Sequence, residues 1–148
     1  MLFLAGETKE AFRYYEKALK MNLDNANTLN NFAYYLSLEN KDLERALVMA
    51  ERANKLSPQN ATYLDTQAWV LYQLGRYEEA QNLMRQALVL DTSGSPELLI
   101  HYGDILYALG SEFMAQTYWQ RALEAGADGK QIVERLNRLN KAKDDDVQ

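Results

Sequence analysis

The sequence predicts an all-α fold in which helix pairs stack into an open solenoid. The first observation is two series of alanines, in which each alanine of the first lies seven residues before one of the second. Both series advance by 35, 34 and 35 residues, a period typical of stacked helical repeats. The second observation is that 148 residues contain 7 glycines and 2 prolines, which favours helix. The two series are Ala11, Ala46, Ala80 and Ala115, and Ala18, Ala53, Ala87 and Ala122.

The composition narrows the classes of function. Hydrophobic residues make up 47% and charged residues 25%, the balance of a soluble globular protein. The formal net charge of -5 argues against a nucleic-acid partner, because phosphate binding requires clustered Lys and Arg. No apolar run approaches the roughly 20 residues of a membrane span. Cysteine is absent, which excludes disulfides, thiolate metal sites and a cysteine nucleophile.

The first unit, residues 1–25, is incomplete. Its second helix is present, whereas its first helix is reduced to Met1–Ala5, so we expect the chain to be an excerpt of a longer protein. The spacing of Tyr14, Ala18 and Met21 predicts that they share one face of the second helix. We expect this helix to lack a partner and to expose Phe3, Phe12 and Tyr15.

Three complete units follow at residues 26–60, 61–94 and 95–127. The first helix of each carries a small residue, and these three lie 35 residues apart: Ala33, Ala68 and Gly103. The second helix of each carries the alanine pair, which lets neighbouring helix backbones approach closely. A larger residue between the paired alanines fills the remaining space in most units, namely Tyr15, Met84 and Trp119, while Ala50 stands there in the unit at 26–60.

The boundaries of these helices have their own signals. Gly75 and Gly110 end the first helix of their units and Asn40 replaces them once, because Gly and Asn tolerate the left-handed conformation that stops a helix. Ser95 followed by Pro96 predicts a helix start, with Ser95 as the N-cap and Pro96 at the first helical position.

Residues 128–142 predict one more, amphipathic helix. The apolar stripe consists of Ile132, Val133, Leu136, Leu139 and Ala142, and the opposite side carries Lys130, Glu134, Arg135, Arg138 and Lys141. A terminal repeat exposes an apolar face, so we interpret this helix as a cap over the last repeat. A helix lying on a membrane surface is the alternative, which the lack of aromatic residues disfavours. We expect residues 143–148 to form a disordered acidic tail.

These features together resemble the tetratricopeptide repeat (TPR) family over roughly residues 1–126. Leu74–Ala80 (LGRYEEA) with Ala87 and Leu88 matches the family pattern closely, and Ala11–Leu19 (AFRYYEKAL) is nearly as close. The resemblance implies a right-handed superhelix of about three and a half repeats that binds protein or peptide and uses no cofactor. The complete units are similar to those of bacterial members, many of them exported or envelope-associated, so the periplasm or envelope is the compartment that the resemblance suggests.

The family geometry also implies where a partner binds. In TPR proteins the first helices of the repeats line a concave groove, and the corresponding positions here are Asn27, Asn30, Tyr34 and Ser37; Thr62, Asp65, Trp69 and Tyr72; and Glu97, Ile100, Asp104 and Tyr107. The aromatic residues among them offer contact area at low entropic cost, while the carboxylates favour a basic or amine-bearing segment. The alternative is that these aromatic residues only pack against neighbouring helices.

The same positions argue against one familiar partner. Chaperone-binding TPR proteins hold a peptide carboxylate with Lys, Asn and Arg, whereas the positions here carry Asn30, Asn31, Tyr34, Glu97 and His101. Glu97 and Asp104 would repel such a carboxylate.

Two other classes of function complete the set of hypotheses. A homodimer formed through the open end of the first unit is the alternative to partner binding. Catalysis would depend on His101, the single histidine, with Asp104 one turn away. The sequence offers no matching nucleophile or metal-ligand set, so we expect no enzyme activity and interpret His101 as a surface or groove residue.

Overall fold

The computed structural model describes the backbone of residues 5–147, with side chains described for residues 8–141 and 145. This described part of the chain forms eight helices and no strand, which confirms the all-α prediction. The expectations for Phe3, for Met1–Leu4 and for the side chain of Ala142 lie outside the described residues. The helices are α1 (Ala5–Met21), α2 (Ala26–Leu38), α3 (Leu43–Leu56), α4 (Ala61–Gln73), α5 (Tyr77–Leu90), α6 (Pro96–Ala108), α7 (Glu112–Glu124) and α8 (Gly129–Val147).

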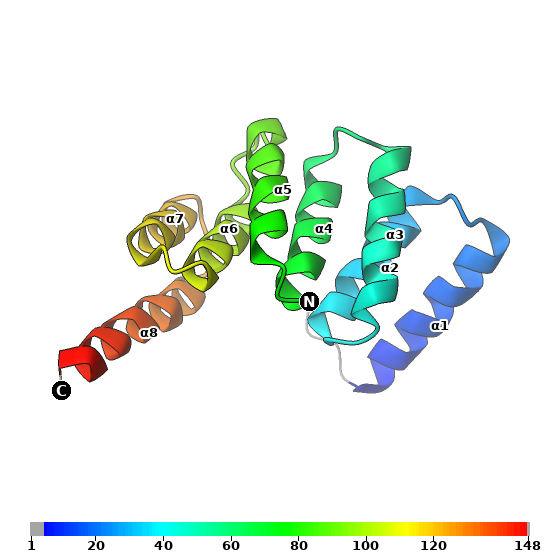
Figure 1. Cartoon of the computed structure of the whole chain (residues 1–148). Helices are drawn as coiled ribbons and strands as arrows, with labels where there is room; N and C mark the ends of the chain where they lie inside the picture. The colour runs from blue at the N-terminus through cyan, green and yellow to red at the C-terminus, as the bar shows by residue number, and fades with distance from the viewer. Residues whose placement is uncertain (1–4, 148) are drawn as a thin grey trace.

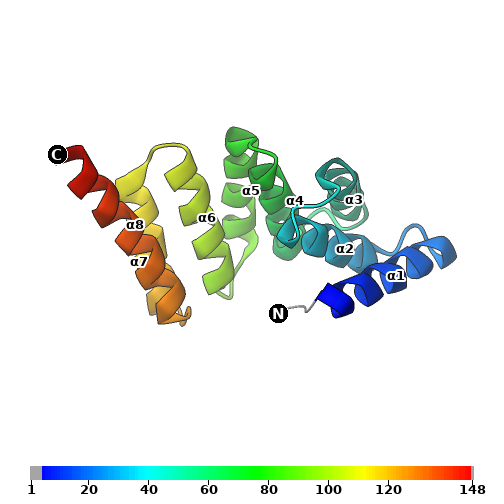
Figure 2. The same ribbon diagram turned by 90° about the horizontal axis from the view of Figure 1, so that it is seen from below.

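The helices follow one another in an open row from α1 at one end to α8 at the other (Figures 1 and 2). Within each repeat the two helices form a pair, α2 with α3, α4 with α5, and α6 with α7. The first helices also contact each other between repeats, α2 with α4 and α4 with α6. The structure is therefore the predicted solenoid of stacked helix pairs. Helices α2, α4 and α6, which are separated in the sequence, lie next to one another in that order.

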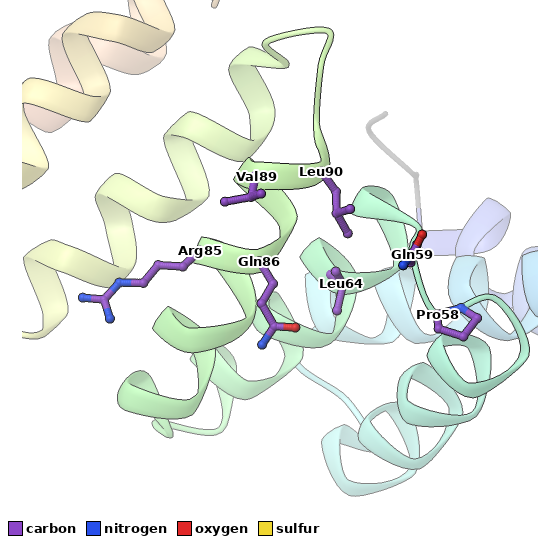
Figure 3. Close-up of a pocket in the computed structure, with 7 residues that line it drawn as sticks. All are labelled: Pro58, Gln59, Leu64, Arg85, Gln86, Val89 and Leu90. Atoms are coloured by element: carbon purple, nitrogen blue, oxygen red, sulfur yellow. The ribbon is translucent and has the colours of Figure 1, made fainter.

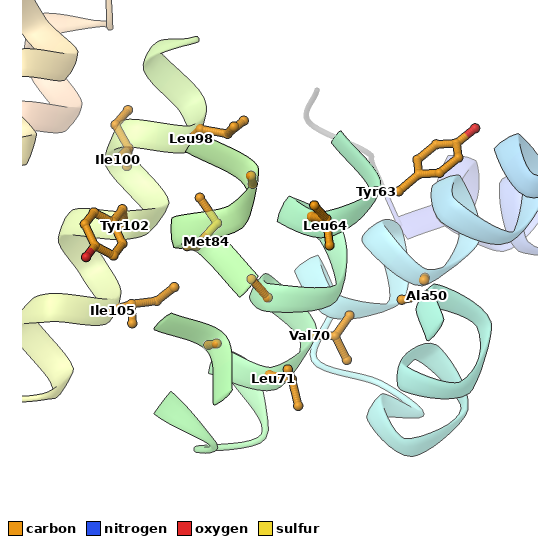
Figure 4. Packing of buried hydrophobic residues seen from close by; sticks show 14 of the residues in the cluster. Ala50, Tyr63, Leu64, Val70, Leu71, Met84, Leu98, Ile100, Tyr102 and Ile105 are labelled. Carbon is orange, nitrogen blue, oxygen red and sulfur yellow. The ribbon is translucent and has the colours of Figure 1, made fainter. Parts of the chain in front are cut away.

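The paired alanines of the three complete repeats form the spine of the core. All six of them are 0% exposed, as are Ala33 and Ala68 on the first helices. The larger residues that fill the intervening space are buried too, Met84 at 0% and Trp119 at 2% exposure. Side chains from successive helices form a continuous apolar layer between the helix pairs (Figure 4).

Local backbone chemistry explains where most helices begin and end. Asn40, Gly75 and Gly110 have φ angles of 53°, 80° and 87°, so the predicted left-handed turns are confirmed. The side chain of Asn60 caps α4 by accepting a hydrogen bond from the Tyr63 backbone N–H at 3.1 Å.

The start of α6 differs from its prediction. Pro96 does occupy the first helical turn, but the Ser95 side chain makes no capping hydrogen bond. Instead the Asp91 carboxylate accepts from the backbone N–H groups of Ser93 and Ser95, at 3.2 and 2.8 Å. Ser95 therefore occupies the predicted N-cap position, but the turn is held by an aspartate four residues before it and not by the serine side chain.

The expectation that α1 lacks a partner is wrong, because this helix packs against α2. Phe12 and Tyr15, expected to be exposed, are half-buried, with ring centroids 5.4 and 5.5 Å from that of Phe32 on α2. Tyr14 and Met21, expected to share a face with Ala18, are 68% and 82% exposed. The large rings of Phe12 and Tyr15 face α2 because their apolar area is buried there.

The cap helix α8 is longer than the expected 128–142, since it continues to Val147 through most of the expected disordered tail. Ile132 and Leu139 are buried at 0% and 3% exposure, as the stripe predicted. Val133 is 54% exposed and does not belong to the stripe, because it is rotated by about 100° from Ile132. No helix within the described residues has both the length and the apolar character to cross a bilayer.

Candidate functional site

The predicted binding residues come from α2, α4 and α6, and we call the side of these helices that carries them the A-helix face. Glu97, Asn27 and Thr62 are exposed there, while Tyr34, Trp69, Tyr72, Asp104 and Tyr107 are half-buried. Asn30 and Asp65 are buried at 5% and 4% exposure. Ser37 and Ile100, expected on this face, are buried as well, so they offer little to a partner.

A tyrosine–carboxylate contact spans the face from α2 to α6. The Tyr34 hydroxyl donates a hydrogen bond to Glu97 Oε1 at 2.8 Å, although the two residues are 63 positions apart. Burial and then the Glu97 charge raise the pKa of Tyr34, so its hydroxyl stays protonated and remains a donor. This hydrogen bond joins α2 to α6 and holds one oxygen of the exposed Glu97 carboxylate.

Next to this contact, Asp65 on α4 pairs with His101 on α6. His101 Nδ1 lies 2.7 Å from Asp65 Oδ1, and His101 is only 7% exposed. The sequence suggested Asp104 as the neighbour and a surface or groove position for His101, and both expectations are wrong. Burial alone would lower the pKa of His101, but the Asp65 charge and hydrogen bond outweigh it and raise that pKa.

An aromatic stack adjoins the pair. The Trp69 ring stacks on His101 with centroids 4.1 Å apart and on Tyr72 with centroids 4.5 Å apart. The Trp69 indole N–H is buried and has no hydrogen-bond partner. The Tyr107 ring packs against the Trp119 ring with centroids 5.8 Å apart. The aromatic residues therefore hold the repeats together and also present their remaining, half-buried edges on the A-helix face.

Asp104 is engaged by the cap helix. Arg135 on α8 donates two hydrogen bonds to its carboxylate at 2.7 and 2.9 Å, and the Trp119 indole N–H donates a third at 3.0 Å. Arg135 was assigned to the polar side of the helix, which is wrong. The signal was present, because Arg135 lies three residues after Ile132 and four before Leu139 and so shares their face.

Asn27 and Asn30, the two asparagines of α2 predicted to bind a partner, differ from each other. The Asn27 amide oxygen accepts a hydrogen bond from the Tyr63 hydroxyl, which ties α2 to α4. Asn30 is buried, and its Oδ1 accepts no hydrogen bond. Of the twelve predicted positions, those that are exposed or half-buried are thus Asn27, Tyr34, Thr62, Trp69, Tyr72, Glu97, Asp104 and Tyr107.

A pocket of about 560 Å³ lies elsewhere, against α5 (Figure 3). Its walls are Pro58, Gln59, Leu64, Arg85, Gln86, Val89 and Leu90. One of these residues, Val89, is 83% exposed. None of the predicted binding residues lines this pocket. The sequence alone does not predict this pocket, because its residues come from a loop and two helices that only the stacking of the repeats brings together.

Comparison with known proteins relates this geometry to one family. The sequence model of the tetratricopeptide repeat matches residues 61–93. A TPR repeat-containing protein of Pseudomonas aeruginosa is 34% identical to the chain over 65 residues, which are 44% of this chain and 11% of that protein. The chain thus spans about a tenth of the length of the curated relative that it matches.

Two solved structures share the arrangement of helices. YrrB, described as a TPR protein with an unusual peptide-binding site, has a TM-score of 0.66 at 30% identity, over 80% of this chain and 60% of that one. The first TPR of Spaghetti (RPAP3), bound to the HSP90 peptide SRMEEVD, has a TM-score of 0.70 at 17% identity, over 79% of this chain and 91% of that one. At 17% identity the second likeness concerns the fold alone.

Proposed function

We propose that the chain, which is similar to tetratricopeptide-repeat proteins, is a protein-interaction module whose A-helix face binds a segment of another protein. The observation that carries this proposal is the row of half-buried aromatic side chains, Tyr34, Trp69, Tyr72 and Tyr107, beside the exposed carboxylate of Glu97. Aromatic side chains with one edge fixed by packing lose little entropy on binding, which is why such residues dominate interfaces.

The preferred segment carries a basic residue. Glu97 is exposed, whereas Asp65 beside it is buried against His101, so Glu97 is the carboxylate open to a partner. At the other end Arg135 neutralises Asp104. A Lys or Arg of the partner therefore gains most at Glu97, with the Tyr34 and Trp69 rings beside it for cation–π contact.

A fluorescence-anisotropy survey with paired peptides tests this preference. Each peptide keeps its aromatic and aliphatic residues and carries either Lys or Glu at the remaining positions, and the acidic peptide SRMEEVD is included. We expect the basic member of a pair to bind at least about tenfold more tightly, since like charges at Glu97 repel the acidic one. Equal binding of both members would overturn the basic preference, and no binding to any peptide would remove the A-helix face as the site.

Glu97→Gln is the decisive variant, because the side chain is exposed and the amide can still accept the Tyr34 hydrogen bond. We expect it to abolish the difference between basic and acidic peptides. Glu112→Gln, an exposed carboxylate on α7, is the matched control and is expected to leave the difference intact. Trp69→Ala is unsuitable, since it removes the stack on His101 and Tyr72 and lowers stability along with binding.

We propose self-association through α1 as a second function, on a separate observation. Tyr14 and Met21 are 68% and 82% exposed on α1. Ala11 and Ala18 are half-buried, whereas their counterparts in the three other repeats are 0% exposed. An apolar strip of this kind favours a second copy across a two-fold axis.

Light scattering over a wide concentration range tests this second function. We expect a dimer that dissociates when Tyr14→Lys and Met21→Lys are combined. Val89→Lys, which changes an equally exposed apolar residue on α5, is the control and should leave the dimer unchanged. A monomer at every concentration would remove the second function without affecting the first.

A further inference from the structure

We propose that Asp65, Glu97 and His101 form a binding site for a divalent transition-metal ion of the zinc class on the A-helix face. One ligand atom from each residue lies within 4.8 Å of the others. Asp65 comes from α4, while Glu97 and His101 stand four residues apart on α6 and so project from the same side of that helix. The site joins two neighbouring repeats, because Asp65 belongs to one and Glu97 and His101 to the next.

The donor set fits this class of ion. Imidazole nitrogen suits zinc, copper and nickel, and carboxylate oxygens complete many such sites. With metal–ligand bonds of about 2.0–2.2 Å, tetrahedral ligand atoms lie roughly 3.3 Å apart. His101 Nδ1 and Asp65 Oδ1 are already 2.7 Å apart, so they need to separate only slightly. Glu97 is exposed, and one of its carboxylate oxygens already lies within 4.8 Å of the other two ligand atoms, so a small shift brings it to the ion.

The metal would replace a proton. In the structure the short contact between His101 Nδ1 and Asp65 Oδ1 requires a hydrogen between them. When the ion binds to the imidazolium form, the Nδ1 proton leaves to solvent and Nε2 keeps its hydrogen, and the freed Nδ1 lone pair and the carboxylate coordinate the ion instead. Two carboxylates and a neutral imidazole then carry two negative charges, which balance a divalent cation.

The surroundings supply the support that metal ligands need. The Tyr34 hydroxyl holds Glu97 at 2.8 Å, and the Trp69 ring fixes the plane of the His101 imidazole by stacking at 4.1 Å.

The chain offers a clean experiment, because His101 is its single histidine and it has no cysteine. An untagged chain is titrated with CoCl₂ and observed in the visible spectrum, where Co²⁺ in a site of low coordination number absorbs strongly. We expect one Co²⁺ per chain, displaced by ZnCl₂, and a rise in the thermal midpoint with Zn²⁺. Tyr34→Phe should weaken Co²⁺ binding about tenfold through the loss of support for Glu97.

Two further variants assign the ligands. His101→Gln should abolish the Co²⁺ spectrum, but its burial puts folding at risk. Glu97→Gln keeps the exposed side chain and the fold, and should weaken Co²⁺ binding by about tenfold or more. Glu112→Gln is the control and should bind as the wild type does. Absence of Co²⁺ and Zn²⁺ binding to the wild-type chain, or unchanged binding in Glu97→Gln, would overturn the site, whatever the outcome of the peptide survey.

Discussion

At the scale of single residues, Gly103 and Trp119 show how one repeat adapts to a large side chain. A Cβ atom at Gly103 would lie within 3.0 Å of Trp119 Cδ1 and Nε1, closer than real Cβ contacts come. The corresponding pair in the preceding repeat is Ala68 and Met84, both 0% exposed. The sequence showed that both positions must be small, but not that a tryptophan across the helix pair demands glycine.

Gly103→Ala should therefore destabilise the chain. Alanine gains about 1 kcal/mol of helix propensity, whereas overpacking typically costs 1–3 kcal/mol, and Trp119 cannot yield freely because its N–H bonds Asp104. We expect a net loss of about 1–2 kcal/mol in the free energy of unfolding, measured with urea. Combining Gly103→Ala with Trp119→Met reproduces the Ala68–Met84 pair and should show favourable coupling. A Gly103→Ala chain as stable as the wild type would contradict the steric argument.

The Asp104–Arg135 pair makes a second prediction at this scale. The side chains of Arg135 and Asp104 are only 17% and 11% exposed, so removing the guanidinium leaves a poorly solvated carboxylate. Arg135→Ala should lower the free energy of unfolding by about 2 kcal/mol. Arg138→Ala removes an exposed cation from the same helix and should change it by less than about 0.5 kcal/mol. Equal effects in the urea titration would show that the Asp104 contact contributes nothing.

At the scale of helices, the repeat period predicted which elements form, but neighbouring chain segments altered their ends. The alanine series and the turns at Asn40, Gly75 and Gly110 depend on local geometry, so the sequence alone predicts them. The start of α6 depends on Asp91 reaching forward to the backbone of Ser95, which a cap motif does not reveal. The orientation of α1 depends on Phe32, a residue of another helix.

Helix capping supplies the prediction at this scale. Asn60→Ala removes the hydrogen bond from the Tyr63 backbone N–H and should cost about 1 kcal/mol. Ser95→Ala precedes the corresponding helix of the next repeat, but its hydroxyl caps nothing, so its effect should stay within about 0.5 kcal/mol. Thermal unfolding of the two variants side by side checks this. A larger loss of stability for Ser95→Ala than for Asn60→Ala would show that the Ser95 hydroxyl does cap α6.

At the scale of the whole molecule, the site could be predicted only as a set of positions. The family resemblance placed twelve positions on three helices, and all of them do come from α2, α4 and α6. Their partners were not predictable, because the contact of Tyr34 with Glu97 and that of Asp65 with His101 depend on the exact height at which successive repeats stack. If α6 were shifted along α4 by one helical turn, about 5.4 Å, Asp65 would face a residue other than His101.

The open row of helices also determines how far a destabilising substitution affects the stability of other repeats. Each repeat contacts only its neighbours, so stability is close to a sum of local and interface contributions. Ile132→Asp places a charge at a fully buried position of α8 and should undock the cap. In hydrogen exchange, we expect amide protection to fall most in α7 and α8, less in α5, and little in α2 and α3. Val133→Asp, at the adjacent but 54% exposed position, should leave the pattern unchanged. If Ile132→Asp instead lowers protection uniformly from α2 to α8, the array unfolds as one cooperative unit, and the energetic independence of the repeats is wrong.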